Sequence, residues 1–260
     1  TRYAYLRWSQ RTGIFEEAAM YPNPFTITGG EPDQDWVYEE ASRTLHILSN
    51  RVTAISGGTG TDTNQVPFSG RLALADSIGT LGLTLGGVVC RVPAGRAFNL
   101  GRRNHVTLLL QRGASNFFEI GAGCAGITLG EGTSLCISDA PGSRDGALTA
   151  TGGAGGAGIG RDSNGGSSQT SRIEITGGMI TATGTGGGAG IGAGKRSPIG
   201  PVTITGGTVT STGAEGGGAG IGGALGAPVG DISIHGGTIT AIATDHAAAI
   251  GAGVQGESGD

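Results

Sequence analysis

A short phrase returns along the second half of the chain at nearly constant intervals. GAGIG stands at 156–160, 188–192 and 218–222, AAAIG takes the matching place at 247–251, and AGI stands upstream at 125–127. The isoleucines of these phrases lie 32, 32, 30 and 29 residues apart. They are Ile127, Ile159, Ile191, Ile221 and Ile250. A period of this length indicates a repeat architecture, in which each unit buries its apolar face only against its neighbours.

The residues inside each unit predict strands. In VTITGGTVTSTG at 202–213, β-branched apolar residues alternate with threonine, which is the period of a half-buried strand. Each unit reads as a strand, a Gly-Gly corner, a second strand, a glycine-rich corner, a short strand at AGI and a variable loop. We therefore predict an all-β fold, a single right-handed parallel β-helix of about 30 residues per coil. Its isoleucines should form an interior ladder, and the loops at 161–172, 193–201 and 223–231 should emerge along one edge.

The segment GGGAGIGG at 216–223 also has the G-x-G-x-x-G spacing of a dinucleotide-binding loop. Such a loop must follow a strand and open a helix, but Gly226, Pro228 and a period-two run follow it here. A motif that recurs in every unit is better explained as architecture, and we expect no cofactor. Glycine would allow positive φ at corners and a close approach of neighbouring backbones.

The repeat divides the chain into three parts. The regular glycine-rich coils occupy 146–260, and the less regular strands of 25–145 should form the opening coils. Residues 1–24 lie outside the repeat and are expected to be an N-terminal segment or a cap over open strand edges. Because the chain starts with threonine and ends within the pattern, we expect it to be a processed form or a fragment of a longer protein.

Composition excludes several classes of function. Fifty-six glycines in 260 residues argue against a helix-rich fold, since an interior glycine costs a helix about 1 kcal/mol. A net charge of −4 provides no attraction to nucleic acid or anionic lipid. No apolar run reaches the length of a membrane-spanning helix, so we expect no membrane insertion.

Three cysteines, Cys90, Cys124 and Cys136, make an odd count without metal-ligand spacing, and we expect no metal site. Cys136 lies between inward-facing residues of SLCIS and should point outward, whereas Cys124 should be buried. A disulfide between Cys124 and Cys136 and three unpaired thiols both remain open.

The chain resembles the glycine-rich right-handed β-helix proteins that bacteria secrete or display on their surface, often described as carbohydrate-binding domain proteins. The matching text is VTITGGTVTSTGAEGGGAGIGG at 202–223, CAGITLGEGTSLCIS at 124–138, VTLLLQRGASNFF at 106–118 and the opening segment at 25–58. The resemblance covers about residues 25–255. It implies a secreted or cell-surface location and a role as an adhesin or stalk, with polysaccharide or neighbouring surface subunits as partners.

One candidate ligand site is basic. Arg161 follows one GIG step, and Lys195 and Arg196 lie just beyond the next, on loops that stacked coils would bring together. The three side chains could form a cationic patch for the carboxylates of an acidic glycan, because arginine makes bidentate contacts. The alternative is a solvated loop edge.

A second candidate site is aromatic. Sugar-binding faces commonly stack tryptophan or tyrosine on pyranose rings, but no aromatic residue other than histidine occurs from residue 146 onward. Trp36 and Tyr38 in DQDWVYEE are therefore the candidates, with core packing as the alternative.

No catalytic residues can be assigned from the pattern. A β-helix hydrolase needs carboxylates close together on one face, whereas the acidic residues of the repeat fall at different corners. These residues, with one adjacent histidine, are Asp139, Asp145, Asp162, Glu174, Glu215, Asp231, Asp245 and His246. We therefore expect a non-catalytic module, with a polysaccharide lyase or glycoside hydrolase and a structural filament subunit as alternatives.

Overall fold

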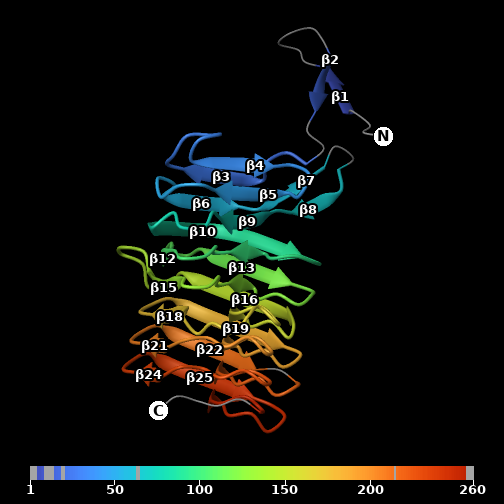
Figure 1. Ribbon diagram of the computed structural model, residues 1–260. Coiled ribbons are helices and arrows are strands. Elements are labelled where there is room, and N and C mark those ends of the chain that lie inside the picture. The colour runs from blue at the N-terminus through green and yellow to red at the C-terminus, as the bar shows by residue number, and fades with distance from the viewer. Residues whose placement is uncertain (1–4, 9–14, 19–20, 63–64, 214, 256–260) are drawn as a thin grey trace.

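The coils stack into a single column in the computed structural model (Figure 1), which describes residues 5–8, 15–18, 21–62, 65–213 and 215–255. Every element in this part of the chain is a strand or a turn, as the sequence predicts. The strands form a β-solenoid of about seven turns with about 29 residues per turn. No helix in the described residues is long and apolar enough to cross a membrane.

Three series of parallel strands, called runs here, build the column, and each coil adds one strand to a run. The first run is β10 (Thr80–Val92), β12 (His105–Leu110), β15 (Ser134–Asp139), β18 (Arg172–Ile175), β21 (Val202–Ile204) and β24 (Ile232–Ile234). The second run again starts at β10 and continues through β13 (Ser115–Ile120), β16 (Ala147–Ala154), β19 (Met179–Thr185), β22 (Thr208–Gly213) and β25 (Thr238–Ala243). The long β10 joins the two runs because its first half pairs with β12 and its second half with β13.

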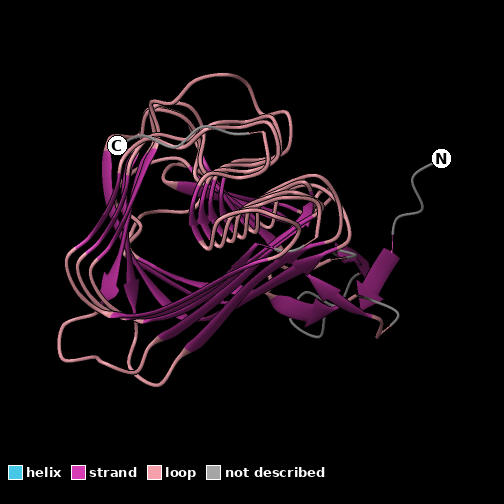
Figure 2. Ribbon diagram, turned by 90° about the horizontal axis from the view of Figure 1, so that it is seen from below, coloured by secondary structure: helices cyan, strands magenta, loops and turns pink. Residues whose placement is uncertain are grey.

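The third run carries the isoleucine ladder. It is β5 (Thr44–Ile47), β9 (Arg71–Leu74), β11 (Phe98–Asn99), β14 (Ile127–Thr128), β17 (Ile159–Gly160), β20 (Ile191–Gly192), β23 (Ile221–Gly222) and β26 (Ile250–Gly251). Ile127, Ile159, Ile191, Ile221 and Ile250 are partners in register, and Leu45, Leu72 and Phe98 continue the row upstream. Viewed along the column, the strands of successive coils lie over one another (Figure 2).

The core is the interior of the column. Inward residues alternate with outward ones along each strand, as in β12, where every second side chain is buried. All members of the isoleucine ladder except Ile250 are fully buried. Burying a large aliphatic side chain stabilises a fold by about 1.5–3 kcal/mol, so the ladder is a main source of stability.

The opening coils depart from the parallel pattern. β3 (Phe25–Thr28) pairs antiparallel with β6 (Ala54–Gly57), and β4 (Trp36–Glu39) pairs antiparallel with β5. β7 (Thr59–Thr61) and β8 (Pro67–Ser69) form a hairpin, and so do β1 (Tyr5–Trp8) and β2 (Phe15–Ala18). Among the described residues, β1 and β2 pair only with each other, and β3 and β4 are the outermost strands of the column at this end.

The variable loops stack on one another. The N–H of Asn164 donates to the carbonyl of Lys195 at 2.9 Å, and the N–H of Arg196 donates to that of Leu225 at 2.9 Å. A bridge joins Ile199 to Val229. These contacts extend the coil-to-coil pairing into the loops.

The three cysteines are free thiols. Cys90 is buried, and Cys136 faces outward from β15. Cys124 is half-buried rather than buried as expected, because it lies in the turn before β14 and not in the core row.

Candidate functional site

Arg161 lies directly after β17 and is only 4% exposed. Its Nη1 donates to the carbonyl of Leu129 at 2.9 Å, and its Nη2 donates to that of Gly165 at 2.8 Å. Lys195 is half-buried and Arg196 is exposed on the next loop. The expectation that Arg161 forms an exposed cationic patch with Lys195 and Arg196 was wrong, because its guanidinium group is drawn inward to backbone carbonyls. Of the three residues, only Arg196 lies at an exposed loop edge.

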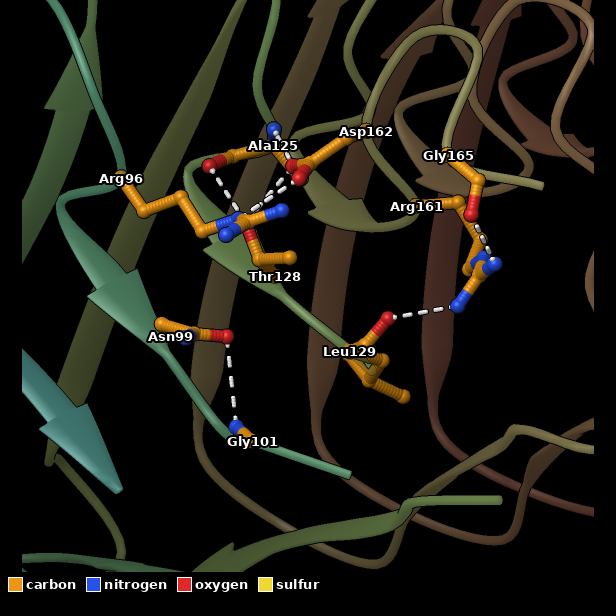
Figure 3. A network of polar contacts seen from close by, with 9 residues as sticks. All are labelled: Arg96, Asn99, Gly101, Ala125, Thr128, Leu129, Arg161, Asp162 and Gly165. Carbon is orange, nitrogen blue, oxygen red and sulfur yellow. Dashed lines mark hydrogen bonds and ion pairs between the residues drawn. The ribbon is translucent and has the colours of Figure 1, made fainter. Parts of the chain in front are cut away.

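The side chain of Asp162, the residue after Arg161, joins three coils through its hydrogen bonds (Figure 3). One carboxylate oxygen of Asp162 accepts hydrogen bonds from the N–H of Ala125 at 2.7 Å and the hydroxyl of Thr128 at 2.8 Å. Its other oxygen accepts one from Nε of Arg96 at 2.7 Å. The side chain of Asp162 is 8% exposed and that of Arg96 is 49% exposed. The network therefore fixes a buried carboxylate and leaves one face of its arginine partner open to solvent.

The pKa values of the two arginines shift in opposite directions. Burial lowers the pKa of Arg161, although the nearby charges of Asp162 and Glu131 oppose this. Burial also lowers the pKa of Arg96, but the charge and hydrogen bond of Asp162 outweigh it and raise the pKa overall. Both groups stay cationic, since a guanidinium group is not deprotonated in proteins.

These residues line a lateral cleft of about 300 Å³. Its charged side chains come from successive coils of the third run. Five of them follow the carboxyl ends of those strands, and Arg96 precedes β11. The charged side chains are Arg96, Arg102, Arg161, Asp76, Glu131 and Asp162. Cations and carboxylates are equal in number, so the cleft offers donors and acceptors side by side without a strong net charge.

One buried donor in the cleft has no partner among the described residues. Nε of Arg161 is buried and makes no hydrogen bond to any described residue. A buried unsatisfied donor costs about 1–3 kcal/mol, so stability alone does not explain why arginine occupies this position.

The carboxylates of the cleft differ in what they can do. Both oxygens of Asp162 already accept hydrogen bonds from described residues. One oxygen of Asp76 accepts from the N–H of Arg102 at 2.8 Å, whereas the Glu131 carboxylate is exposed and bonds to no described residue. The described residues contain no cluster of three or more histidine, cysteine or acidic side chains that could hold a metal ion. The arrangement is suited to hydrogen bonding with a polar ligand.

Trp36 and Tyr38 do not line this cleft. Both lie on β4, are half-buried and pack against the core. The hydroxyl of Tyr38 is buried without a partner, and burial, helped by the charge of Glu40, raises its pKa to about 12. The structure thus places the aromatic candidates and Arg161 at separate positions.

Sequence reasoning missed Arg96, Arg102, Asp76 and Glu131 as neighbours of Arg161. The register of the third run brings these residues together, and in it Asn99 and Thr128 occupy the places that glycines hold in later coils. That register could not be read from the opening coils, whose sequence lacks the GAGIG phrase.

Comparison with protein-family models, with curated proteins and with solved structures gives no match to this chain.

Proposed function

We propose that this protein is a non-catalytic β-solenoid module of the cell surface or extracellular space, which acts as a stalk or adhesin and contacts polysaccharide. The observation that supports this proposal is the lateral cleft, with its balanced set of guanidinium and carboxylate groups. A sugar hydroxyl donates and accepts at once, and such a mixed lining satisfies both roles. The resemblance of the GGAGIG coils to surface β-helix proteins supports the location.

The scaffold favours binding without rearrangement. Arg96, Thr128 and Asp162 come from three coils and are held by strand pairing and by the Asp162 hydrogen bonds. A site that is rigid before its ligand arrives avoids the entropy loss of ordering side chains. A rod of stacked coils also separates a contact surface from its attachment point, which suits display.

Affinity electrophoresis on gels containing neutral or acidic polysaccharides tests the proposal, followed by a product assay on every polysaccharide that retards the protein. Arg102→Gln and Glu131→Gln remove exposed cleft groups that bond to no described residue through their side chains. We expect both changes to reduce retardation. Arg172→Gln, an exposed arginine outside the cleft, should leave it unchanged. Absence of retardation on every gel would contradict the proposal.

A glycoside hydrolase or lyase is the second candidate, favoured by the presence of Asp76, Glu131 and Asp162 in one cleft. Glycoside hydrolysis uses a pair of carboxylates on either side of the scissile bond. Release of new sugar ends by the unmodified protein, lost in Glu131→Gln, would replace the binding proposal with this one.

A further inference from the structure

A second hollow, of about 530 Å³, lies at the corner where the first run of strands turns into the second. Two successive coils line it, with Arg112 from the turn between β12 and β13 and residues 142–145 from the turn between β15 and β16. None of these residues lines the cleft around Arg161, so the hollow is a separate feature of the surface.

The hollow is rich in unused hydrogen-bond donors. Arg112 and Arg144 are exposed, and no side chain or carbonyl in the described part of the chain engages either guanidinium group. The backbone N–H groups of Gly142, Arg144 and Asp145 also lack an acceptor among the described residues. The hydroxyl of Ser143, which is 7% exposed, is buried without a partner.

One carboxylate shapes the hollow. The Oδ1 of Asp145 accepts a hydrogen bond from the N–H of Gly113 at 3.0 Å and so ties the two turns together. Its charge offsets one of the two arginines, which leaves the lining with a single excess positive charge. Local charge and donor content therefore favour an anion, although the whole chain carries a net charge of −4.

We infer that this hollow binds a tetrahedral oxyanion, the sulfate or phosphate group of a ligand. The planar fork of a guanidinium group matches two oxygens of such a group, and unpaired N–H groups of a turn are known to hold oxyanions. Arginines from two coils and the turn amides offer donors to more than two oxygens. A carboxylate has only two oxygens and would leave part of this donor set unused.

The test is a titration of the full chain followed by ¹H–¹⁵N NMR at constant ionic strength. Sodium sulfate, sodium phosphate and sodium acetate are the three probes. We expect sulfate, phosphate or both to shift the amide signals of Gly142, Arg144 and Asp145 with a saturable curve, and acetate to bind more weakly. Comparing the first two curves identifies which group is preferred.

Four variants distinguish a specific binding site from general charge attraction. Arg112→Gln and Arg144→Gln should each weaken binding about tenfold. Asp145→Asn keeps an oxygen for the Gly113 amide but removes the repulsive charge, so it should tighten binding. Arg172→Gln removes the same charge elsewhere and should have no effect.

Linear shifts without saturation, acetate binding as tight as sulfate and phosphate, or an equal loss in Arg172→Gln would each overturn the inference. A dispersed spectrum like that of the unmodified chain shows that a variant is folded.

Discussion

The carboxylate of Asp162 links residues that are far apart in sequence. Its hydrogen bonds to Ala125, Thr128 and Arg96 span three coils, and its side chain is almost fully buried. A buried charge of this kind is tolerated only when donors surround it. The geometry therefore makes Asp162 the residue on which the shape of the cleft depends.

Replacing Asp162 with asparagine should lower the free energy of unfolding by about 1–3 kcal/mol. The new amide can keep two hydrogen bonds through its oxygen, but its NH₂ group would face the Nε–H of Arg96, which is also a donor. Urea denaturation of the variant measures the loss. Arg96→Gln should cost less, because Arg96 is half exposed. Purely additive losses in the double variant would contradict direct coupling of the two residues.

The buried hydroxyl of Tyr38 should make the stability of the protein depend on pH in alkaline solution. Burial raises the pKa of its hydroxyl to about 12 in the fold, against an unfolded value of about 10. The neutral form is therefore favoured by folding. The contribution of the neutral hydroxyl to the free energy of unfolding is complete below pH 10 and is lost as the pH rises through 12. Urea midpoints across this range should fall less steeply for Tyr38→Phe than for the unmodified chain. Since the hydroxyl is buried without a partner, this variant should be at least as stable at neutral pH. Equal slopes for the two proteins would refute the assignment.

At the scale of the strand and its corner, glycine serves two purposes in the GAGIG phrase. Gly222 follows the ladder isoleucine with a φ of 136°, a conformation that residues with a side chain rarely adopt. Gly220 precedes the isoleucine and needs no positive φ. A Cβ there would lie 2.7 Å from the carbonyl oxygen of Ala249 in the next coil. The corner conformation and the close approach of coils therefore belong to different glycines of one phrase.

Gly220→Val should destabilise the fold by about 3 kcal/mol, because the obstructing atoms belong to backbone and cannot rotate away. A Cβ at Gly190 would meet the corresponding backbone atoms of Gly220 and Thr212 and also the hydroxyl of Ser211, so Gly190→Val should behave alike. Gly82 on β10 is the matched control, since nothing lies within 4 Å of its Cβ position and it has no positive φ. Gly82→Val should be neutral or stabilising, because valine favours strands. Thermal unfolding followed by circular dichroism compares the three, and an unchanged midpoint in Gly220→Val would rule out the packing explanation.

The regular coils could be predicted from the sequence because each one repeats the same local signals. Alternating Thr and Val or Ile residues fix which side faces inward, and the recurring glycines mark the corners. The antiparallel pairing of β3 with β6 and of β4 with β5 could not be predicted, since a strand's own residues do not determine the direction of its partner. The pairing of Arg96 with Asp162 was missed for a similar reason. The two residues are two coils apart, and coil length varies between them.

For the whole molecule, the two ends of the column differ. At one end β3 and β4 run antiparallel to their neighbours, and Trp36 and Tyr38 pack against the core. At the other end β24, β25 and β26 have no further strand beside them in the described residues. Ile234 and Ile250 occupy inward positions there, yet they are 39% and 45% exposed. Open strand edges beside exposed apolar residues favour association with another chain.

This asymmetry predicts how copies of the 260-residue chain associate. A head-to-tail filament would have to match the open parallel edges of one copy to the antiparallel end of the next. Two copies that meet through their last coils instead bury like surfaces about a two-fold axis, which gives a closed dimer. We therefore expect sedimentation velocity to show a concentration-dependent dimer without larger species. Ile234→Lys combined with Ile250→Lys should leave a folded monomer. Met179→Lys, which changes an outward residue that is 48% exposed on β19, should leave the dimer intact. A monomer at every concentration would refute the dimer, whereas open-ended growth would favour the structural filament subunit.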